Sequence, residues 1–346
     1  TEVRDVEVRP LEEGIPIKVG AVHAKNANFT TLLRDFHVHP RPFVTWDIHE
    51  IHVTNFSGHA DPLKLDGEVS ARTSNFAVYD RPAKEVATRE RIFGVPEASI
   101  VGKLEVRPKG FSFANTTVTT TKSVAHNASV MIGYHEEIAI DVPSAKVDLA
   151  EMSPLGNVVM SGIAEPKVHI TGTAGDPMLE GETSIKDFVM GDIPFGDVLQ
   201  AKITSDIGNT KVDLMDVKAR KGRSVYEMST GRLDFHKPAK MVLEAQVFSK
   251  ALNIRDFFSL FHLDDDPRLE QLDGWLDTNA RMRLVLGGPE DRCDGGFLTV
   301  SASANGKDLN VLGEHFDEGH ADLEYRWDDR LAGLEGADID IHSMSL

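Results

Sequence analysis

The sequence predicts an all-β protein built from successive antiparallel strands, each with one apolar and one polar face. Two observations carry this prediction. Apolar and polar residues alternate in many segments, which is the pattern of a strand that buries one face. Turn-forming residues separate these segments, and most neighbouring segments have no helical pattern between them. Short turns without crossover helices favour antiparallel pairing over a doubly wound α/β fold.

Four runs show the alternation most clearly, and each places an apolar residue at every second position. Polar residues such as Glu244 and Ser301 fill the positions between them, as expected where the opposite face meets water. The four apolar sets are Ile15, Ile17, Val19 and Ala21; Met241, Leu243, Ala245 and Val247; Leu298, Val300, Ala302 and Ala304; and Ala321, Leu323, Tyr325 and Trp327. Alternation is also present at Leu104, Val106, Phe111 and Phe113.

Turn chemistry recurs between the runs, because glycine and asparagine accept the backbone angles of a tight reversal and proline fixes one of them. The spacing of these segments predicts a meander of strands. The predicted turns are Asn305-Gly306, Gly208-Asn209, Lys221-Gly222, Gly287-Gly288-Pro289, Gly175-Asp176-Pro177 and Arg107-Pro108-Lys109-Gly110.

One segment has the 3.6-residue period of an amphipathic helix. Asn253 or Asp256 is suited to cap its start, and the run from Asp264 to Pro267 ends it. We interpret it as a helix that covers one end of a sheet, since its acidic charge disfavours a membrane-surface helix. Its apolar residues are Leu252, Ile254, Phe257, Phe258, Leu260, Phe261 and Leu263.

A charged stretch from about residue 80 to 95 interrupts the alternation and is the best candidate for a soft boundary. We therefore expect two stretches of the same architecture, residues 1–95 and 96–346. The first residue is Thr1 rather than Met, so we expect the sequence to begin inside a longer precursor, or after processing of one.

Composition narrows the classes of function. The formal net charge of −18 repels phosphate backbones, and no basic stretch carries the interleaved aromatic residues of a nucleic-acid surface. No segment approaches the roughly 18 apolar residues of a membrane-spanning helix. The single cysteine, Cys293, rules out an intramolecular disulfide and a cysteine-based zinc site.

Histidines are the strongest candidates for chemistry, because His37, His39, His49, His52 and His59 fall in a short span. Two imidazoles on one strand face are a possible zinc or copper chelate. No cysteine or clearly paired carboxylate completes the set, so we expect no metal and no cofactor. The motifs of acyl transfer, nucleotide binding and zinc proteases are absent as well, and the expectation is a non-enzymatic protein.

From about residue 166 onward the sequence resembles the C-terminal part of the TamB or AsmA-like family of bacterial envelope proteins. The resemblance rests on the order of glycine, apolar strand, Gly-x-Pro turn and Leu-x-Gly hairpin. The segments that carry it are Val168–Thr173, Pro177–Glu182, Phe195–Val198, Tyr226–Leu233, Leu252–Phe258 and Leu286–Pro289.

This resemblance implies a long sheet folded into a taco-like or jelly-roll groove with an apolar interior. It implies a periplasmic segment of an inner-membrane-anchored protein, with membranes at both ends, that conducts phospholipid and supports outer-membrane biogenesis. The implied partners are phospholipid acyl chains and an outer-membrane protein of the Omp85/TamA type. Burial of an acyl chain stabilises it by about 0.8 kcal/mol per CH₂, so an apolar inner wall suits such a cargo.

Neighbouring strands in register present the same face, so nine apolar residues are predicted to form one lipid-binding wall. They are Met241, Leu243, Ala245, Val247, Leu298, Val300, Leu323, Tyr325 and Trp327. If the groove is open, aspartate at position 243 or 323 reaches water and leaves the fold mostly intact.

Two alternatives stay open. The apolar faces of two sheets can bury each other in a closed β-sandwich, or stack in a β-solenoid, as in a surface or adhesin protein. A β-helix carbohydrate-active enzyme is the third hypothesis.

Overall fold

The computed structural model describes residues 2–8, 15–28, 44–79, 91–135, 137–153, 158–173, 176–206, 211–235, 241–267, 269–287, 296–328 and 336–345. The predicted turn at Gly208-Asn209, Gly288-Pro289 of the turn predicted at Gly287-Gly288-Pro289, and Gly175 of the turn predicted at Gly175-Asp176-Pro177 lie outside these ranges, as do His37, His39 and Cys293.

The strands in chain order are β1 (Glu2–Val8), β2 (Pro16–Asn28), β3 (Val44–Ala60), β4 (Leu63–Tyr79), β5 (Arg91–Arg107), β6 (Gly110–Thr119), β7 (Val124–Gly133), β8 (Glu137–Val142), β9 (Ser144–Asp148), β10 (Met160–Ala164), β11 (Lys167–Thr173), β12 (Asp176–Met190), β13 (Ile193–Asp206), β14 (Lys211–Lys221), β15 (Ser224–Asp234), β16 (Met241–Asn253), β17 (Asp273–Leu286), β18 (Gly296–Val311), β19 (Glu314–Asp328) and β20 (Ala337–Ser345). The helices are α2 (Leu149–Met152) and α3 (Ile254–Ser259).

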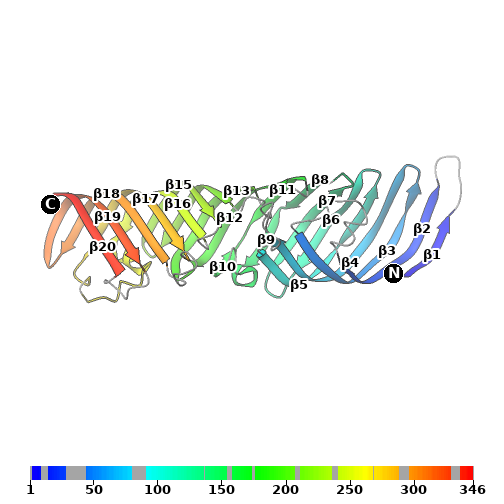
Figure 1. The fold of residues 1–346 in the computed structure, drawn as a ribbon, viewed down its shortest axis with the longest axis horizontal. Coiled ribbons are helices and arrows are strands. Elements are labelled where there is room, and N and C mark those ends of the chain that lie inside the picture. Colours follow the sequence, from blue (N-terminus) through cyan, green and yellow to red (C-terminus); the bar gives the residue numbers. More distant parts are fainter. Residues whose placement is uncertain are drawn as a thin grey trace, which may run out of the picture. The chain divides into compact units, whose positions relative to one another are not determined.

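The predicted all-β class is confirmed, because the strands pair in an antiparallel sheet (Figure 1). In the described ranges, helix is confined to the four residues of α2 and the six of α3. The chain forms two compact units. Unit 1 comprises residues 1–153, 164–181 and 205–209, and unit 2 comprises residues 154–163, 182–204 and 210–346. The division does not fall at residue 95, which lies inside β5.

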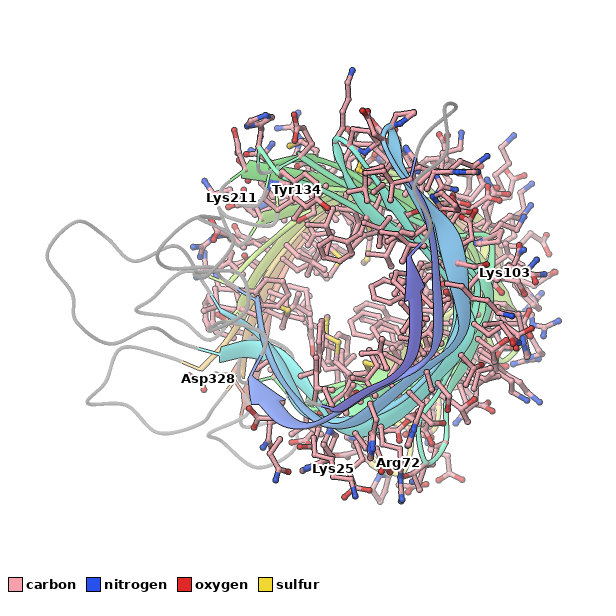
Figure 2. All side chains as sticks on the ribbon, turned by 90° about the vertical axis from the view of Figure 1, so that its right-hand side faces the viewer. Lys25, Arg72, Lys103, Tyr134, Lys211 and Asp328 are labelled. Atoms are coloured by element: carbon pink, nitrogen blue, oxygen red, sulfur yellow. The ribbon has the colours of Figure 1, made fainter. Side chains whose placement is uncertain are left out.

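In unit 1, consecutive strands from β1 to β8 pair with one another, and β11 then pairs with β8. The charged residues Lys25, Arg72 and Lys103 lie on the outer, convex face of these curved strands (Figure 2). Successive side chains of a strand point to opposite faces, so Leu104, next to Lys103, lies on the concave face. In unit 2, the strands from β14 to β20 pair in chain order.

Asparagine or aspartate in the left-handed backbone region recurs inside the strands. Asn55, Asn115 and Asp308 have φ of 54°, 50° and 50°, and each lies at a shift in the pairing register. These two residue types tolerate the left-handed region better than other non-glycine residues. Each shift is a β-bulge, which adds one residue and raises the local twist. The alternation therefore changes phase across the bulge, so the half-buried Phe113 is followed by the buried Thr116 three residues later.

Helix α3 confirms the predicted helix in part. It begins after Asn253, whose side-chain oxygen accepts the N–H of Arg255 at 3.1 Å, so Asn253 rather than Asp256 is the cap. The helix ends at Ser259, and Leu252 belongs to β16, so the helix is shorter than predicted. Helix α2 was not predicted; Asp148 caps it by accepting the N–H of Ala150 at 2.9 Å.

The turn predictions are partly correct. The turns at Pro108-Lys109 and Gly222-Arg223 join β5 to β6 and β14 to β15. The turn predicted at Asn305-Gly306 is wrong, because both residues lie inside β18 and pair with β17 and β19. The reversal after β18 is at Leu312 and Gly313, which have φ of 54° and 86°.

Candidate functional site

The nine residues predicted as a lipid-binding wall lie on one face of unit 2. Pairing places them in cross-strand rows, because residues opposite each other in a ladder point the same way. Met241 is opposite Leu286. The other rows are Leu243, Leu284, Leu298 and Trp327; Ala245, Met282, Val300 and Tyr325; and Val247, Ala280, Ala302 and Leu323.

Helix α3 covers part of this face. The ring of Phe257 lies 5.6 Å from that of Tyr325, and the ring of Phe261 lies 5.7 Å from Tyr325 and 5.3 Å from Trp327. Such separations are typical of packed aromatic pairs. Leu263, just beyond the helix, is 2% exposed. The segment after β16 therefore folds back onto the apolar face of its own sheet.

Burial divides the nine predicted residues. Met241, Leu243, Ala245, Leu298, Tyr325 and Trp327 are buried, whereas Val247, Val300 and Leu323 are half-buried. The condition of an open groove is not met at position 243, because the Leu243 side chain is 3% exposed and its row neighbours Leu284 and Leu298 are as deeply buried. This part of the wall is a packed core.

Polar contacts fix α3 in this position. The carboxylate of Asp256 accepts the N–H groups of Arg223 and Ser224 at 2.8 and 2.9 Å and the Ser224 hydroxyl at 2.7 Å. The Asn253 side chain, 1% exposed, donates to the carbonyl of Gly274 at 3.2 Å. The helix is thus tied to the β14–β15 turn and to the start of β17.

Four buried hydroxyls of the described residues have no hydrogen-bond partner, and one of them, that of Tyr325, lies in the core of unit 2. The Tyr325 hydroxyl makes no hydrogen bond, whereas the Tyr226 hydroxyl donates to the Phe195 carbonyl at 2.6 Å. Burial raises the pKa of both phenols far above the usual value, so both hydroxyls stay protonated. A buried hydroxyl without a partner is a local cost to stability.

The concave face of unit 1 carries two apolar rows that are longer than those of unit 2 and less buried, although Val53 and Val69 on the same face are buried. One row runs across β2 to β8 and ends on β11, and a second runs from β4 to β11. The first is Ile17, Gly58, Leu65, Val106, Phe111, Ile132, Ile138 and Gly172, and the second is Gly67, Leu104, Phe113, Val130, Ile140 and Ile170.

Most large side chains of these rows are half-buried, and Ile132 alone among them is buried. The rings of Phe111 and Phe113 meet edge to face at 6.0 Å between centroids. Leu104, Val106, Phe111 and Phe113 showed their alternation in the sequence, but the predicted wall did not include them. The signal that could have found them is therefore the same alternation that identified the wall in unit 2.

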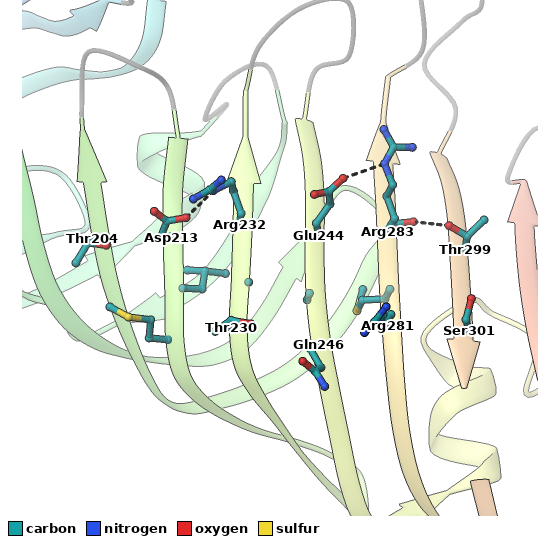
Figure 3. Close-up of a pocket in the computed structure, with 15 residues that line it drawn as sticks. Thr204, Asp213, Thr230, Arg232, Glu244, Gln246, Arg281, Arg283, Thr299 and Ser301 are labelled. Atoms are coloured by element: carbon teal, nitrogen blue, oxygen red, sulfur yellow. Dashed lines mark hydrogen bonds and ion pairs between the residues drawn. The ribbon is translucent and has the colours of Figure 1, made fainter. Parts of the chain in front are cut away.

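The polar face of unit 2 carries a row of alternating charge, shown in Figure 3. Arg232 donates to Asp213 at 2.6 Å, and Arg283 donates to Glu244 at 3.2 Å. A shallow hollow of about 690 Å³ lies beside them. Exposed ion pairs contribute roughly 0–1 kcal/mol each, so this row fits a solvated outer surface better than a ligand site.

No protein-family model, curated protein or solved structure matches the chain. Among the helices that the structure describes, none is long and apolar enough to cross a membrane.

Proposed function

We propose that the chain is a lipid-conducting segment of a bridge-like envelope protein, and that the concave face of unit 1 holds phospholipid acyl chains. In this proposal the segment lies in the periplasm and belongs to an inner-membrane-anchored protein. It passes phospholipid between the inner and outer membranes, supports outer-membrane biogenesis and works with an outer-membrane partner of the Omp85/TamA type. It is not an enzyme.

The observation that carries the proposal is the half-buried state of the apolar rows of unit 1. The first row crosses eight strands, and seven spacings of about 4.8 Å give it a length of about 34 Å along the sheet. One leaflet of a bilayer contains acyl chains about 15 Å deep, so the row exceeds the length of one chain.

The energy of burial supports an acyl chain as the occupant. Each CH₂ group of the acyl chain that is removed from water contributes about 0.8 kcal/mol to binding. The same contact removes apolar surface of the half-buried row residues from water, which adds to the binding free energy. The acidic chain, with a net charge of −18, gives no attraction for anionic headgroups, so recognition rests on the acyl chains.

The packing of α3 on unit 2 is the reason to place the proposed lipid site in unit 1. The predicted wall of unit 2 is filled by Phe257 and Phe261 where it passes Tyr325 and Trp327. We therefore assign the acyl-chain contacts to Leu104, Val106, Phe111 and their row neighbours. Val247, Val300 and Leu323, which are half-buried, stay secondary candidates.

A purely structural role is the alternative. The packed core of unit 2 favours it, because an apolar face covered by its own chain needs no ligand. In a surface or adhesin module, the apolar faces of both units would serve only to stabilise the fold.

Photo-crosslinking separates the two roles. A benzophenone amino acid in place of Leu104 faces the concave side, and the same group in place of Lys103 faces outward (Figure 2). When the protein is crosslinked in bacterial cells, we expect phospholipid adducts from position 104 and none from position 103. A folded protein that gives no adduct at position 104 overturns the proposal.

A pair of aspartate substitutions gives an independent check. Leu104→Asp places a charge on a half-buried face, so we expect the protein to stay folded and to lose phospholipid in native mass spectrometry. Leu243→Asp buries an unpaired carboxylate, which costs several kcal/mol, so we expect unit 2 to unfold. Unchanged lipid content in folded Leu104→Asp protein would argue for the structural role.

A further inference from the structure

A cluster of two histidines and a glutamate lies on the polar face of β2 and β3 in unit 1. His23 of β2 is directly opposite His52 of β3 in the ladder, and Glu50 lies two residues before His52 on the same face. Neither the predicted histidine set nor the proposed lipid site includes His23. The cluster became visible only through the pairing of the two strands.

The three side chains bring their ligand atoms close together. The Nε2 atoms of His23 and His52 lie 3.1 and 3.2 Å from Oε1 of Glu50. The two imidazole rings are stacked, with centroids 4.1 Å apart and an angle of 15° between their planes, so one ring must turn about its Cβ–Cγ bond before both nitrogens can bind one ion. All three candidate ligand atoms lie within 4.8 Å of one another.

This donor set matches a known kind of metal site. Two imidazoles and one carboxylate are the protein ligands of many zinc sites that keep a fourth position for water. Ligand bonds of about 2.1 Å in a tetrahedron place the ligand atoms about 3.4 Å apart. The nitrogen-to-oxygen distances of the cluster are within a few tenths of an ångström of that spacing.

We propose that His23, Glu50 and His52 bind a divalent transition metal, with zinc as the first candidate. The side chains are 28%, 31% and 47% exposed, so the fourth position faces solvent. Glu50 also borders a hollow of about 540 Å³ on this face, which gives the ion a path of entry.

The charges around Glu50 set the expected affinity. Lys25 lies 3.5 Å from the same Oε1 atom and competes with a cation for it, and Arg72 is opposite Glu50 in β4. Lys25 is 62% exposed and can swing into water, so it weakens the site without blocking it.

The alternative is a hydrogen-bonded histidine–glutamate cluster without metal. It predicts that zinc binds no more tightly to these residues than to scattered surface histidines. The two accounts also differ in their response to Lys25, because only a metal ion competes with its ammonium group.

Calorimetric titration of the whole chain with ZnCl₂ tests the proposal. We expect one site whose affinity falls at least about tenfold in His23→Ala, His52→Ala and Glu50→Gln, since even residues behind the ligands commonly contribute that much. The matched control is His169→Ala, an exposed histidine beside Asp141 in the same unit, which should bind as the wild type does. The double variant His37→Ala/His39→Ala serves as a second control for the histidines outside the described ranges.

Lys25→Met should tighten zinc binding by about ten- to thirtyfold, because two unit charges 4 Å apart in water repel each other by about 1 kcal/mol and the divalent ion doubles this energy. Lys103→Met, a lysine elsewhere on the outer face, should not change the affinity. The proposal is overturned if zinc does not bind, if binding survives in His23→Ala and His52→Ala, or if it is lost only in His37→Ala/His39→Ala. The test does not depend on lipid, so its outcome is independent of the conduit proposal.

Discussion

The rings of Phe261 and Trp327 lie 5.3 Å apart at an angle of 49°. This contact joins the segment after α3 to strand β19. Both residues are buried. Because of this contact, the apolar face of the sheet is covered by its own chain and forms part of a closed core.

Phe261→Ala should lower the free energy of unfolding by about 3–5 kcal/mol, because it removes a buried aromatic ring and leaves a cavity against Tyr325 and Trp327. Urea unfolding followed by tryptophan fluorescence measures the loss. Phe297→Ala is the control, since Phe297 is 38% exposed and should cost much less. Equal losses in the two variants would contradict the packing of α3.

Tyr325→Phe should be neutral or stabilising, because the hydroxyl that it removes is buried without a hydrogen bond. Tyr226→Phe is the matched control: it removes the donor to the Phe195 carbonyl and should cost about 1 kcal/mol. Thermal denaturation of both variants gives the comparison. A clear loss of stability in Tyr325→Phe would show that the hydroxyl has a partner after all.

Stability at acid pH should depend on Glu151. Its carboxylate accepts the hydroxyl of Ser123 at 2.6 Å, the hydroxyl of Thr120 and the N–H of Lys122 at 3.1 Å, which ties α2 to the β6–β7 turn. Burial raises the pKa of this carboxyl, but these hydrogen bonds outweigh it, and the folded-state pKa lies below the usual value.

A carboxyl with a lowered pKa stabilises the fold above its unfolded-state pKa of about 4.3, and this contribution is lost as the pH falls through the folded-state pKa. Glu151→Gln should therefore be less stable than the wild type at pH 7, and the gap should shrink toward pH 3. Urea unfolding at a series of pH values checks this, with Glu97→Gln, an exposed position, as the control. A gap that is constant with pH would exclude the ionised carboxylate as its cause.

Asn115→Val should destabilise unit 1 by about 1–2 kcal/mol, because a β-branched residue is strained at the φ of 50° that Asn115 adopts. Asn115→Gly should stay within about 0.5 kcal/mol of the wild type, since glycine adopts this conformation freely. Denaturant unfolding of the two variants separates backbone strain from loss of the side chain. Equal effects would mean that the amide group, and not the backbone angle, matters at this bulge.

The sequence allowed much of the fold to be predicted, because alternation identifies which side chains share a face. Leu243, Leu298 and Trp327 were expected on one wall, and the ladder places them in one row. The pattern does not say what covers a face, and the contact of Phe261 with Trp327 joins distant parts of the chain. Alternation alone therefore could not separate the packed core of unit 2 from the half-buried rows of unit 1.

The features that the sequence analysis predicted wrongly or missed have local structural causes. Asn-Gly usually marks a hairpin, but Asn305-Gly306 continues a strand, where Asn305 meets His320 at 2.9 Å. The reversal at Leu312-Gly313 lacks the usual turn composition in its first residue. The histidine cluster was missed because His23 and Glu50 lie on different strands, and only the register brings them together.

The left-handed asparagines and aspartates have a consequence for folding accuracy. Between long strands such as β4, β5 and β19, which have 17, 17 and 15 residues, a slip of two residues returns every apolar side chain to the same face, so the hydrophobic pattern cannot oppose it. A slip would, however, move each bulge away from the one residue that accepts its backbone angle. Asn55, Asn115 and Asp308 thus specify the strand register, because they favour one pairing among several that bury the same face.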